Sequence, residues 1–283
     1  MAFDLAAYLQ RVALKDVMPS PDPDGLRQLQ RAHRLAIPFE NLDMALGRPI
    51  AIDGDAVFDK LVTRNRGGYC FEQNRLFLDA LAALGFDARP LLARVVLSGA
   101  EPVPARTHTI SLVTFRDDAG NETRWIADPG FGGSYSPPMP LAEGETAEAP
   151  DGALYRLARD PLHGWMLSRN GRKETTDGRG DASGWQDQFA FTLDPVFPSD
   201  LAMSNHFVQT SPLSNFANRL VVNAPLPHGF AQILNRRYKR ANAEETTESD
   251  IDDPRVYRIR LGLLFGIQLT AEEIDALGLF GAK

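Results

Sequence analysis

The sequence has 283 residues, 43% of them hydrophobic and 24% charged, a composition typical of globular proteins with one large core or two to three smaller ones. Its net charge of −7 and its isoelectric point near 5.3 argue against nucleic acid as the main partner. A single cysteine excludes an intrachain disulfide. Because the chain has neither the start of a signal peptide nor a run of about 18 apolar residues, we expect a cytoplasmic protein that does not span a membrane.

Residues 1–85 predict a helical domain. Apolar residues recur at helical spacing in four segments, residues 5–12, 25–35, 56–63 and 70–84. Pro38 and Pro49 interrupt the pattern between the second and third segments.

Residues 86–195 predict a β domain, because the apolar period changes to two. The expected strands are residues 89–97, 107–115, 123–128, 154–159 and 165–168. Short strands separated by regular turns favour a small antiparallel barrel or sandwich.

Residues 196–283 mix both patterns and predict an α/β domain. Residues 220–223 and 230–234 read as strands, and the capping box from Thr270 to Glu273 opens a final helix. The acidic stretch 241–253 is expected to be an exposed loop.

The setting of Cys70 favours a reactive thiol. Gly67 and Gly68 permit a sharp turn, and a helical pattern begins at the cysteine. A cysteine in the first turn of a helix lies at the positive end of the helix dipole, which favours the nucleophilic thiolate. A lone cysteine is more often a small buried apolar residue, but the double glycine and the polar residues 72–74 point to a nucleophile.

An activated cysteine needs a base and a group that orients the base. If the turn between strands 107–115 and 123–128 is centred near residue 118, His108 lies opposite Asp128 and Ile110 lies opposite Ile126. Directly opposed side chains are roughly 5 Å apart at Cβ, which allows an imidazole–carboxylate hydrogen bond. The alternative is a structural histidine and an aspartate that only starts a turn. No histidine pair has metal-ligand spacing, so no metal is expected.

The sequence resembles the arylamine N-acetyltransferases over essentially its whole length. The motifs that carry the resemblance are Ile37-Pro38-Phe39-Glu40-Asn41-Leu42, Arg66-Gly67-Gly68-Tyr69-Cys70-Phe71-Glu72-Gln73-Asn74, Thr107-His108, Asp128-Pro129-Gly130-Phe131-Gly132-Gly133 and residues 207–216. Pro129 departs from the family pattern, which commonly has valine there, and removes a backbone N–H beside Asp128.

The resemblance implies an α+β, multidomain fold with an N-terminal helical bundle, a central antiparallel β-barrel and a C-terminal α/β lid. It also implies a catalytic triad of Cys70, His108 and Asp128, like that of cysteine proteases and transglutaminases. The implied reaction is acetyl-CoA-dependent N-acetylation of arylamines, arylhydrazines and arylhydroxylamines by a ping-pong mechanism through acetyl-Cys70.

The resemblance also places the substrates. Three phenylalanines, Phe39, Phe131 and Phe207, occupy family positions that line the acceptor pocket. The residues expected at CoA are Thr107, Gly132, Gly133, Ser134, Thr210 and Ser211. Glu40, Asn41, Arg64 and Arg66 are expected to form a structural network beneath the cysteine turn.

Three other functions stay open. The nearest is an amide synthase that uses a larger or carrier-bound acyl donor with the same triad. A cysteine hydrolase and a catalytically silent CoA- or aromatic-binding protein are the others. The sequence shows no heptad pattern or long exposed apolar stripe that would indicate an oligomer.

Overall fold

The computed structural model describes residues 3–97, 103–117, 119–133, 135–172, 175, 184–216, 219–226, 229–242 and 244–281. Its helices are α1 (Leu5–Arg11), α2 (Pro23–Ala36), α3 (Leu42–Ala45), α4 (Gly54–Phe58), the π-helical turn η1 (Asp59–Thr63), α5 (Cys70–Ala83), α6 (Pro198–Thr210), α7 (Pro254–Phe265) and α8 (Ala271–Ala276). None of the helices in these residues is both long and apolar enough to cross a bilayer.

An eight-stranded antiparallel sheet forms the centre of the molecule, with strand order β5-β4-β3-β2-β9-β8-β7-β6. The strands are β2 (Asp87–Val95), β3 (His108–Arg116), β4 (Glu122–Ala127), β5 (Met139–Pro140), β6 (Thr146–Glu148), β7 (Leu154–Asp160), β8 (Gly164–Asn170) and β9 (Gln186–Phe191). Met139 of β5 and Tyr155 of β7, near opposite ends of the strand order, are buried in one apolar cluster. The sheet therefore curls around its own core as a barrel, and the predicted α+β fold class is confirmed.

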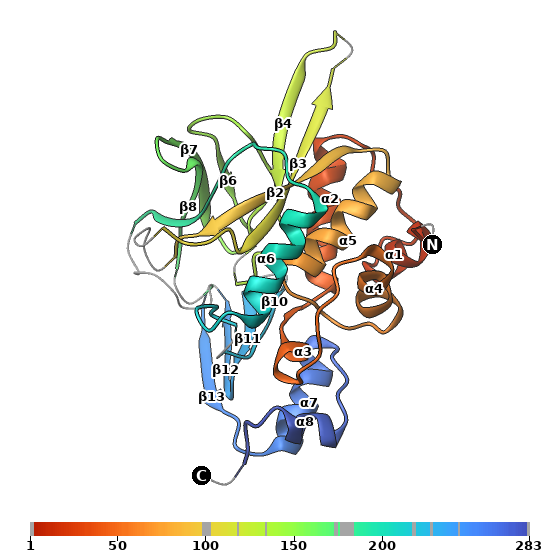
Figure 1. Cartoon of the computed structure of the whole chain (residues 1–283), viewed down its shortest axis with the longest axis vertical. Helices are drawn as coiled ribbons and strands as arrows, with labels where there is room; N and C mark the ends of the chain where they lie inside the picture. Colours follow the sequence, from red (N-terminus) through yellow and green to blue (C-terminus); the bar gives the residue numbers. More distant parts are fainter. Residues whose placement is uncertain are drawn as a thin grey trace.

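A second antiparallel sheet, called the lid sheet here, has strand order β1-β10-β11-β12-β13. Its strands are β1 (Phe39–Glu40), β10 (Val221–Leu226), β11 (Gly229–Leu234), β12 (Arg237–Asn242) and β13 (Thr246–Asp250). Val222 and Ile233 on one face of the sheet pack with Tyr257 and Leu261 of α7. Because β1 comes from the helical part of the chain, it joins that part directly to the lid sheet (Figure 1).

Helix α5 connects the helical part of the chain to the barrel. Its residues Phe77 and Leu81 share a buried cluster with Val113 of β3 and Trp125 of β4. Figure 1 shows α2 and α5 on one side of the barrel sheet, and α6 running toward the lid sheet. Val208 of α6 packs with Cys70 of α5 and Leu92 of β2. The N-terminus of α5 consequently lies where the three parts meet.

Residues 241–253, predicted as an exposed loop, instead contain the edge strand β13. The acidic side chains pair across the ladder, because Arg237 of β12 lies 2.9 Å from Glu248 and 3.3 Å from Asp250. The loop prediction is therefore wrong. Two of the acidic side chains form ion pairs with Arg237 on the neighbouring strand β12.

The hairpin of β3 and β4 has a different register from the predicted one. Leu112, not Ile110, lies opposite Ile126, so the ladder is shifted by two residues. A shift of two keeps each side chain on its face of the sheet, whereas a shift of one would reverse it. His108 and Asp128 therefore stay on one face as diagonal neighbours, although they are not directly opposite each other.

Candidate active site

The turn before Cys70 packs directly on β1. Gly68 N–H donates to the carbonyl of Pro38 at 3.2 Å, and Glu40 N–H donates to the carbonyl of Gly68 at 3.1 Å. A Cβ on Gly67 would lie 2.4 Å from the Pro38 carbonyl oxygen, so only glycine fits this approach. The turn is thus fixed by the Ile-Pro-Phe-Glu motif, and helix α5 begins at Cys70 as predicted.

The Cys70 thiol is buried, with 3% of the residue exposed, and its Sγ lies 3.8 Å from the carbonyl oxygen of Thr107. Burial raises the pKa of this thiol well above its ordinary value, and the carboxylate of Asp128 raises it further. The backbone N–H groups of Phe71 and Cys70 lower the pKa. The helix start therefore acts in the predicted direction, but burial has the larger and opposite effect.

The structure brings His108 and Asp128 into contact. His108 Nε2 lies 2.7 Å from Asp128 Oδ2, and both side chains are buried. Asp128 Oδ1 accepts hydrogen bonds from Asn74 Nδ2 at 3.1 Å and from the N–H of Gly130 at 2.9 Å. The backbone donor to the Asp128 carboxylate is therefore the N–H of Gly130. The missing N–H at Pro129 removes neither of these hydrogen bonds.

Asn74 and Gly130 bring the Asp128 loop against the start of α5. Asn74 Nδ2 also donates to the carbonyl of Cys70 at 3.2 Å, so one amide contacts both the backbone of Cys70 and the carboxylate of Asp128. A Cβ on Gly130 would lie 2.5 Å from Asn74 Nδ2 and 3.0 Å from the Cys70 Cα. This close approach requires glycine at position 130.

Two residues of α2 that the sequence reasoning missed hold the same loop from below. Gln30 Oε1 accepts from the N–H of Asp128 at 2.7 Å, and Gln30 Nε2 donates to the carbonyl of Ser136 at 2.7 Å. Arg34 donates to the carbonyls of Pro129 and Gly133, at 3.0 and 3.3 Å. Their spacing of four residues places both on one face of α2, but nothing in the sequence names a loop about 100 residues away as their partner.

One cavity of about 460 Å³, called the main cavity here, is lined by both Cys70 and His108 and has a size typical of sites for small ligands. Cys70 and His108 line it together with all three predicted acceptor residues, Phe39, Phe131 and Phe207. Its further lining residues are Val95, Val103, Pro104, Ala105, Thr107, Val208, Leu213, Ser214, Asn215 and Phe216. The ring of Phe131 also packs edge-on against His108, with centroids 5.2 Å apart.

The residues expected at CoA are dispersed. Thr107 lines the main cavity, whereas Gly132 and Gly133 line a smaller neighbouring cavity and have positive φ angles of 73° and 65°. Ser134 lies outside the described residues. Thr210 is exposed, and its hydroxyl donates to the carbonyl of His206 at 2.8 Å. Like Ser211, it lies at the end of α6 and does not line the main cavity.

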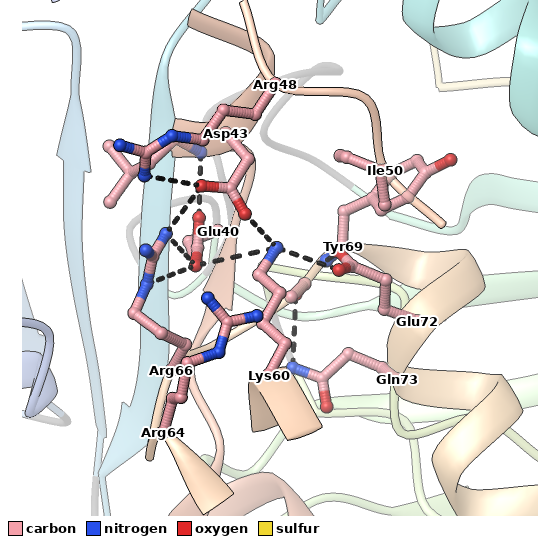
Figure 2. Close-up of polar contacts among 12 residues, drawn as sticks. Glu40, Asp43, Arg48, Ile50, Lys60, Arg64, Arg66, Tyr69, Glu72 and Gln73 are labelled. Atoms are coloured by element: carbon pink, nitrogen blue, oxygen red, sulfur yellow. Dashed lines mark hydrogen bonds and ion pairs between the residues drawn. The ribbon is translucent and has the colours of Figure 1, made fainter. Parts of the chain in front are cut away.

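A buried network of five charged side chains supports the cysteine turn (Figure 2). Lys60 Nζ lies 2.8 Å from both Asp43 Oδ2 and Glu72 Oε1, and Arg66 Nη2 lies 2.8 Å from Glu40 Oε1. The other oxygen of Glu72, Oε2, accepts from the N–H of Tyr69 at 3.0 Å. Burial raises the pKa of Glu72 to about 7, although Lys60 opposes this shift. The network thus reaches Tyr69, one residue before Cys70.

The predicted members of this network need two corrections. Arg64 is exposed and pairs with Asp59, so it does not belong to the network; Lys60 takes part instead. Asn41 binds the lid sheet, because its amide donates to the carbonyl of Arg219 and accepts from the N–H of Val221, both at 2.7 Å. Glu40 and Arg66 are paired as expected.

A second buried chain of hydrogen bonds holds the turn from the other side. Gln73 Nε2 donates to the carbonyls of Pro38 and Gly68, at 2.9 and 3.2 Å, so its Oε1 must accept from His33 Nε2 at 2.7 Å. His33 Nδ1 then accepts from the Tyr8 hydroxyl at 2.9 Å. Burial, with smaller contributions from Arg34 and Arg11, lowers the pKa of His33 to about 3, while Gln73 opposes this shift. The imidazole is therefore neutral.

Comparison with known proteins identifies the family. An N-acetyltransferase family model matches residues 22–274. The arylamine N-acetyltransferase / N-hydroxyarylamine O-acetyltransferase of Salmonella typhimurium is 36% identical over 260 residues, which cover 90% of this chain and 86% of the relative. The Mycolicibacterium smegmatis arylamine N-acetyltransferase is 39% identical over 78% of this chain and 76% of its own. The chain belongs to the arylamine N-acetyltransferase family.

Solved structures of the family have the same fold. The S. typhimurium enzyme superposes with a TM-score of 0.86 at 32% identity, over 98% of both chains. The Mycobacterium marinum enzyme, solved in complex with CoA, gives a TM-score of 0.85 at 32% identity, over 97% of this chain and 98% of the other. This protein is therefore an acyltransferase enzyme. Its described residues contain no group of three or more His, Cys, Asp or Glu side chains that could hold a metal ion.

Proposed function

We propose that this enzyme transfers an acetyl group from acetyl-CoA to arylamines, arylhydrazines and arylhydroxylamines through an acetyl-Cys70 intermediate. The observation that carries the proposal is that Cys70, His108 and the three phenylalanines line one cavity. A thiol and its base thus share a compartment with apolar walls suited to an aromatic ring. The Asp128–His108 contact supplies the third member of a triad.

The first half-reaction begins with proton transfer from Cys70. Because Asp128 holds Nε2 of His108, the ring nitrogen left to accept the thiol proton is Nδ1. The Asp128 carboxylate then stabilises the imidazolium. The Cys70 thiolate attacks the acetyl carbonyl carbon, the C–S bond to CoA breaks, and the imidazolium returns its proton to the departing CoA thiolate.

The second half-reaction transfers the acetyl group to the amine. The amine nitrogen attacks the carbonyl carbon of acetyl-Cys70, and His108 accepts the proton that the nitrogen must lose. The C–S bond then breaks, and Cys70 leaves as a thiolate that takes the proton back from His108. Burial around the thiol keeps water away from the thioester, which favours the amine over hydrolysis.

The donor is proposed by analogy and by size. The M. marinum relative was solved with CoA, which supports CoA as the carrier here. Thr107, at the wall of the main cavity, and the positive-φ pair Gly132 and Gly133 stay candidates for contacts with it. A cavity of about 460 Å³ accommodates an acetyl group and a single aromatic ring, which favours a small acyl donor over a macrocyclic chain.

Intact-mass spectrometry tests the proposal in two steps. Mixing the enzyme with acetyl-CoA alone should add one acetyl group, located at Cys70, and adding 4-aminosalicylate or an arylhydrazine should remove it. Cys70→Ser and His108→Gln should show no thioester under the same conditions. If the wild-type enzyme gains no acetyl group while Cys70 is still alkylated by iodoacetamide, acetyl-CoA is not the donor and a larger or carrier-bound acyl group takes its place.

A further inference from the structure

Helix α6 carries one wall of the main cavity but buries little of its own surface. Phe207 and Val208 line the cavity together with Cys70. Of the thirteen residues of α6, all of which the structure describes, two are buried, Asn205 and Val208. Val208 packs in the apolar cluster that contains Cys70, whereas Asn205 is polar. Because few of its side chains are buried, hydrogen bonds matter more for the position of this helix than for a helix of the core.

Asn205 connects α6 to the residue that precedes Cys70. Its Oδ1 accepts a hydrogen bond from the Tyr69 hydroxyl, and its Nδ2 donates to the carbonyl of Ile50 at 3.0 Å. The carbonyl of Ile50 can only accept, which fixes the amide so that Oδ1 faces the tyrosine. Burial raises the pKa of Tyr69 well above its ordinary value, and Cys70 and Glu72 raise it further. The hydroxyl therefore keeps the proton that it donates.

The Tyr69 side chain lies outside the main cavity. It is fully buried and is not among the described residues that line that cavity. Its ring packs against Phe71 and Phe216, with centroids 5.6 and 6.2 Å away. The hydroxyl thus has no contact with a molecule in the cavity, and its effect on such a molecule passes through Asn205.

A second amide holds α6 without contacting Tyr69. Gln209, one turn after Asn205, accepts from the N–H of Ile50 at 2.7 Å and donates to the carbonyl of Ile50 at 3.2 Å. Both amides therefore bind Ile50, but of the two only Asn205 also binds Tyr69. The attachment of α6 to Ile50 can thus be changed separately from its attachment to the turn before Cys70.

We propose that Asn205 is a positioning residue that sets the width of the main cavity between Cys70 and the α6 wall, and thereby restricts the acyl acceptor by size. This inference rests on the proposed function, because it concerns the amine that attacks acetyl-Cys70. The Tyr69–Asn205 hydrogen bond joins the turn before Cys70 to the helix that carries Phe207 and Val208. Without this bond the α6 wall can move away from Cys70, so a small acceptor loses contacts and a bulkier acceptor gains room.

The test compares 4-methylaniline with 4-butylaniline, two amines that differ in the length of one alkyl group. For each variant, kcat/KM is measured with both amines and expressed as a butyl-to-methyl ratio. Tyr69→Phe and Asn205→Leu should each raise this ratio about threefold to tenfold over wild type, the effect of one lost hydrogen bond. The double variant Tyr69→Phe/Asn205→Leu should differ little from Asn205→Leu, because both changes break the same bond.

Two control variants make the comparison specific. Tyr257→Phe removes a buried tyrosine hydroxyl that has no hydrogen-bond partner among the described residues, so it should leave the ratio unchanged. Gln209→Leu removes hydrogen bonds between α6 and Ile50 but keeps the Tyr69–Asn205 bond. It should lower the melting temperature without changing the ratio. A shift as large as that of Asn205→Leu would overturn the inference, because general attachment of α6 would then explain both.

The pattern across the two amines separates an effect on the cavity wall from an effect on the fold. An equal change of kcat/KM for both amines in Tyr69→Phe and Asn205→Leu would overturn the inference, because the bond would then hold Cys70 or the fold rather than the wall. If Asn205→Leu fails to fold, Tyr69→Phe, which removes a single oxygen atom, carries the test.

Thiol alkylation measures the cavity width independently of acetyl transfer, because Cys70 is the only cysteine of the chain. If wild type forms no acetyl-Cys70, the proposed function fails, and rates of Cys70 alkylation by N-phenylmaleimide and N-ethylmaleimide replace the amine rates. The phenyl-to-ethyl ratio should then be about threefold to tenfold higher in Tyr69→Phe than in wild type. Equal ratios would show that the bond does not set the cavity width.

Discussion

Beneath the cysteine turn, Lys60 contacts the carboxylates of Asp43 and Glu72 at 2.8 Å, and Arg66 contacts Glu40 at the same distance. In the lid sheet, by contrast, the amide oxygens of Asn223 and Gln232 find no donor among the described residues. Both regions bury polar groups next to a residue that lines the main cavity, Cys70 in the first and Phe39 in the second. The first region pairs its charged groups with one another, and the second leaves two amide oxygens without a donor among the described residues.

The difference separates groups that hold the site from groups that do not. In the proposed mechanism Cys70 must keep one position whether or not substrate is bound, and the charged groups beneath its turn are paired within the protein. The lid sheet packs on α7 through apolar side chains, and the amide oxygens of Asn223 and Gln232 add no hydrogen bond among the described residues. We therefore expect changes beneath the turn to reduce stability and all activity, and removal of either lid amide to leave stability nearly unchanged.

Lys60→Met should have the largest effect, because it leaves three buried carboxylates facing one another with one cation fewer. Breaking a buried ion pair from one side costs about 3–5 kcal/mol of unfolding free energy. Urea denaturation followed by circular dichroism measures the loss. Arg64→Met removes a nearby cation from an exposed pair with Asp59 and should cost about 0–1 kcal/mol. Equal effects of the two changes would mean that the buried network does not hold the turn.

Gly130→Ala should mainly affect catalysis. Its Cβ would lie 2.5 Å from Asn74 Nδ2 and 3.0 Å from the Cys70 Cα, so the Asp128 loop must move away from the start of α5. Misplacing catalytic groups by about 1 Å costs on the order of 100-fold in rate, and kcat/KM should fall by that amount. Gly281→Ala, where an added Cβ meets nothing within 4 Å, is the control. Full activity of Gly130→Ala would show that the Asp128 loop can move away from the start of α5 without loss of catalysis.

The parts of this picture that the sequence predicted depend on local signals. The double glycine and the helical period placed Cys70 at the start of α5, because both act within a few residues. The triad contact was predicted through a register that proved wrong by two residues. It survived because strand parity, not the exact pairing, decides which face His108 and Asp128 share.

The parts that the sequence did not predict depend on distant partners. Gln30 and Arg34 lie about 100 residues from the loop they bind, and no local pattern links them. Arg64 and Arg66 are the same residue type, two positions apart. Only the path of the backbone in the turn decides that Arg66, and not Arg64, pairs with Glu40. The edge strand β13 reads as a loop until its basic neighbour is known.

His33 allows a pH test of the Tyr8–His33–Gln73 hydrogen bonds that hold the cysteine turn. Burial holds its pKa at about 3 in the folded protein, below the ordinary value of 6.5, so the unfolded chain binds the proton first as pH falls. Stability from this group is present above pH 6.5 and is lost as pH falls towards 3. From pH 7.5 to 5 its contribution should fall by about 2 kcal/mol. Denaturation of wild type and His33→Gln at both pH values isolates this share, and parallel pH profiles would contradict it.

Gln30→Leu should have the smallest effect and the most informative one. The change keeps the size of the side chain but removes the acceptor for the Asp128 N–H and the donor to the Ser136 carbonyl. An unpaired backbone group costs about 1–3 kcal/mol, and part of this should appear as a roughly tenfold lower kcat, with the KM for acetyl-CoA nearly unchanged. Gln28→Leu, on the exposed side of the same helix, is the matched control.

The pH–rate profile gives a second measurement. Because Gln30 acts through Asp128, its loss should also move the acid limb of that profile, which a purely structural role would leave in place. If kcat and that limb match the control, α2 supports the fold of the loop but does not position the triad. In that case Asn74 and Gly130 alone position the Asp128 carboxylate.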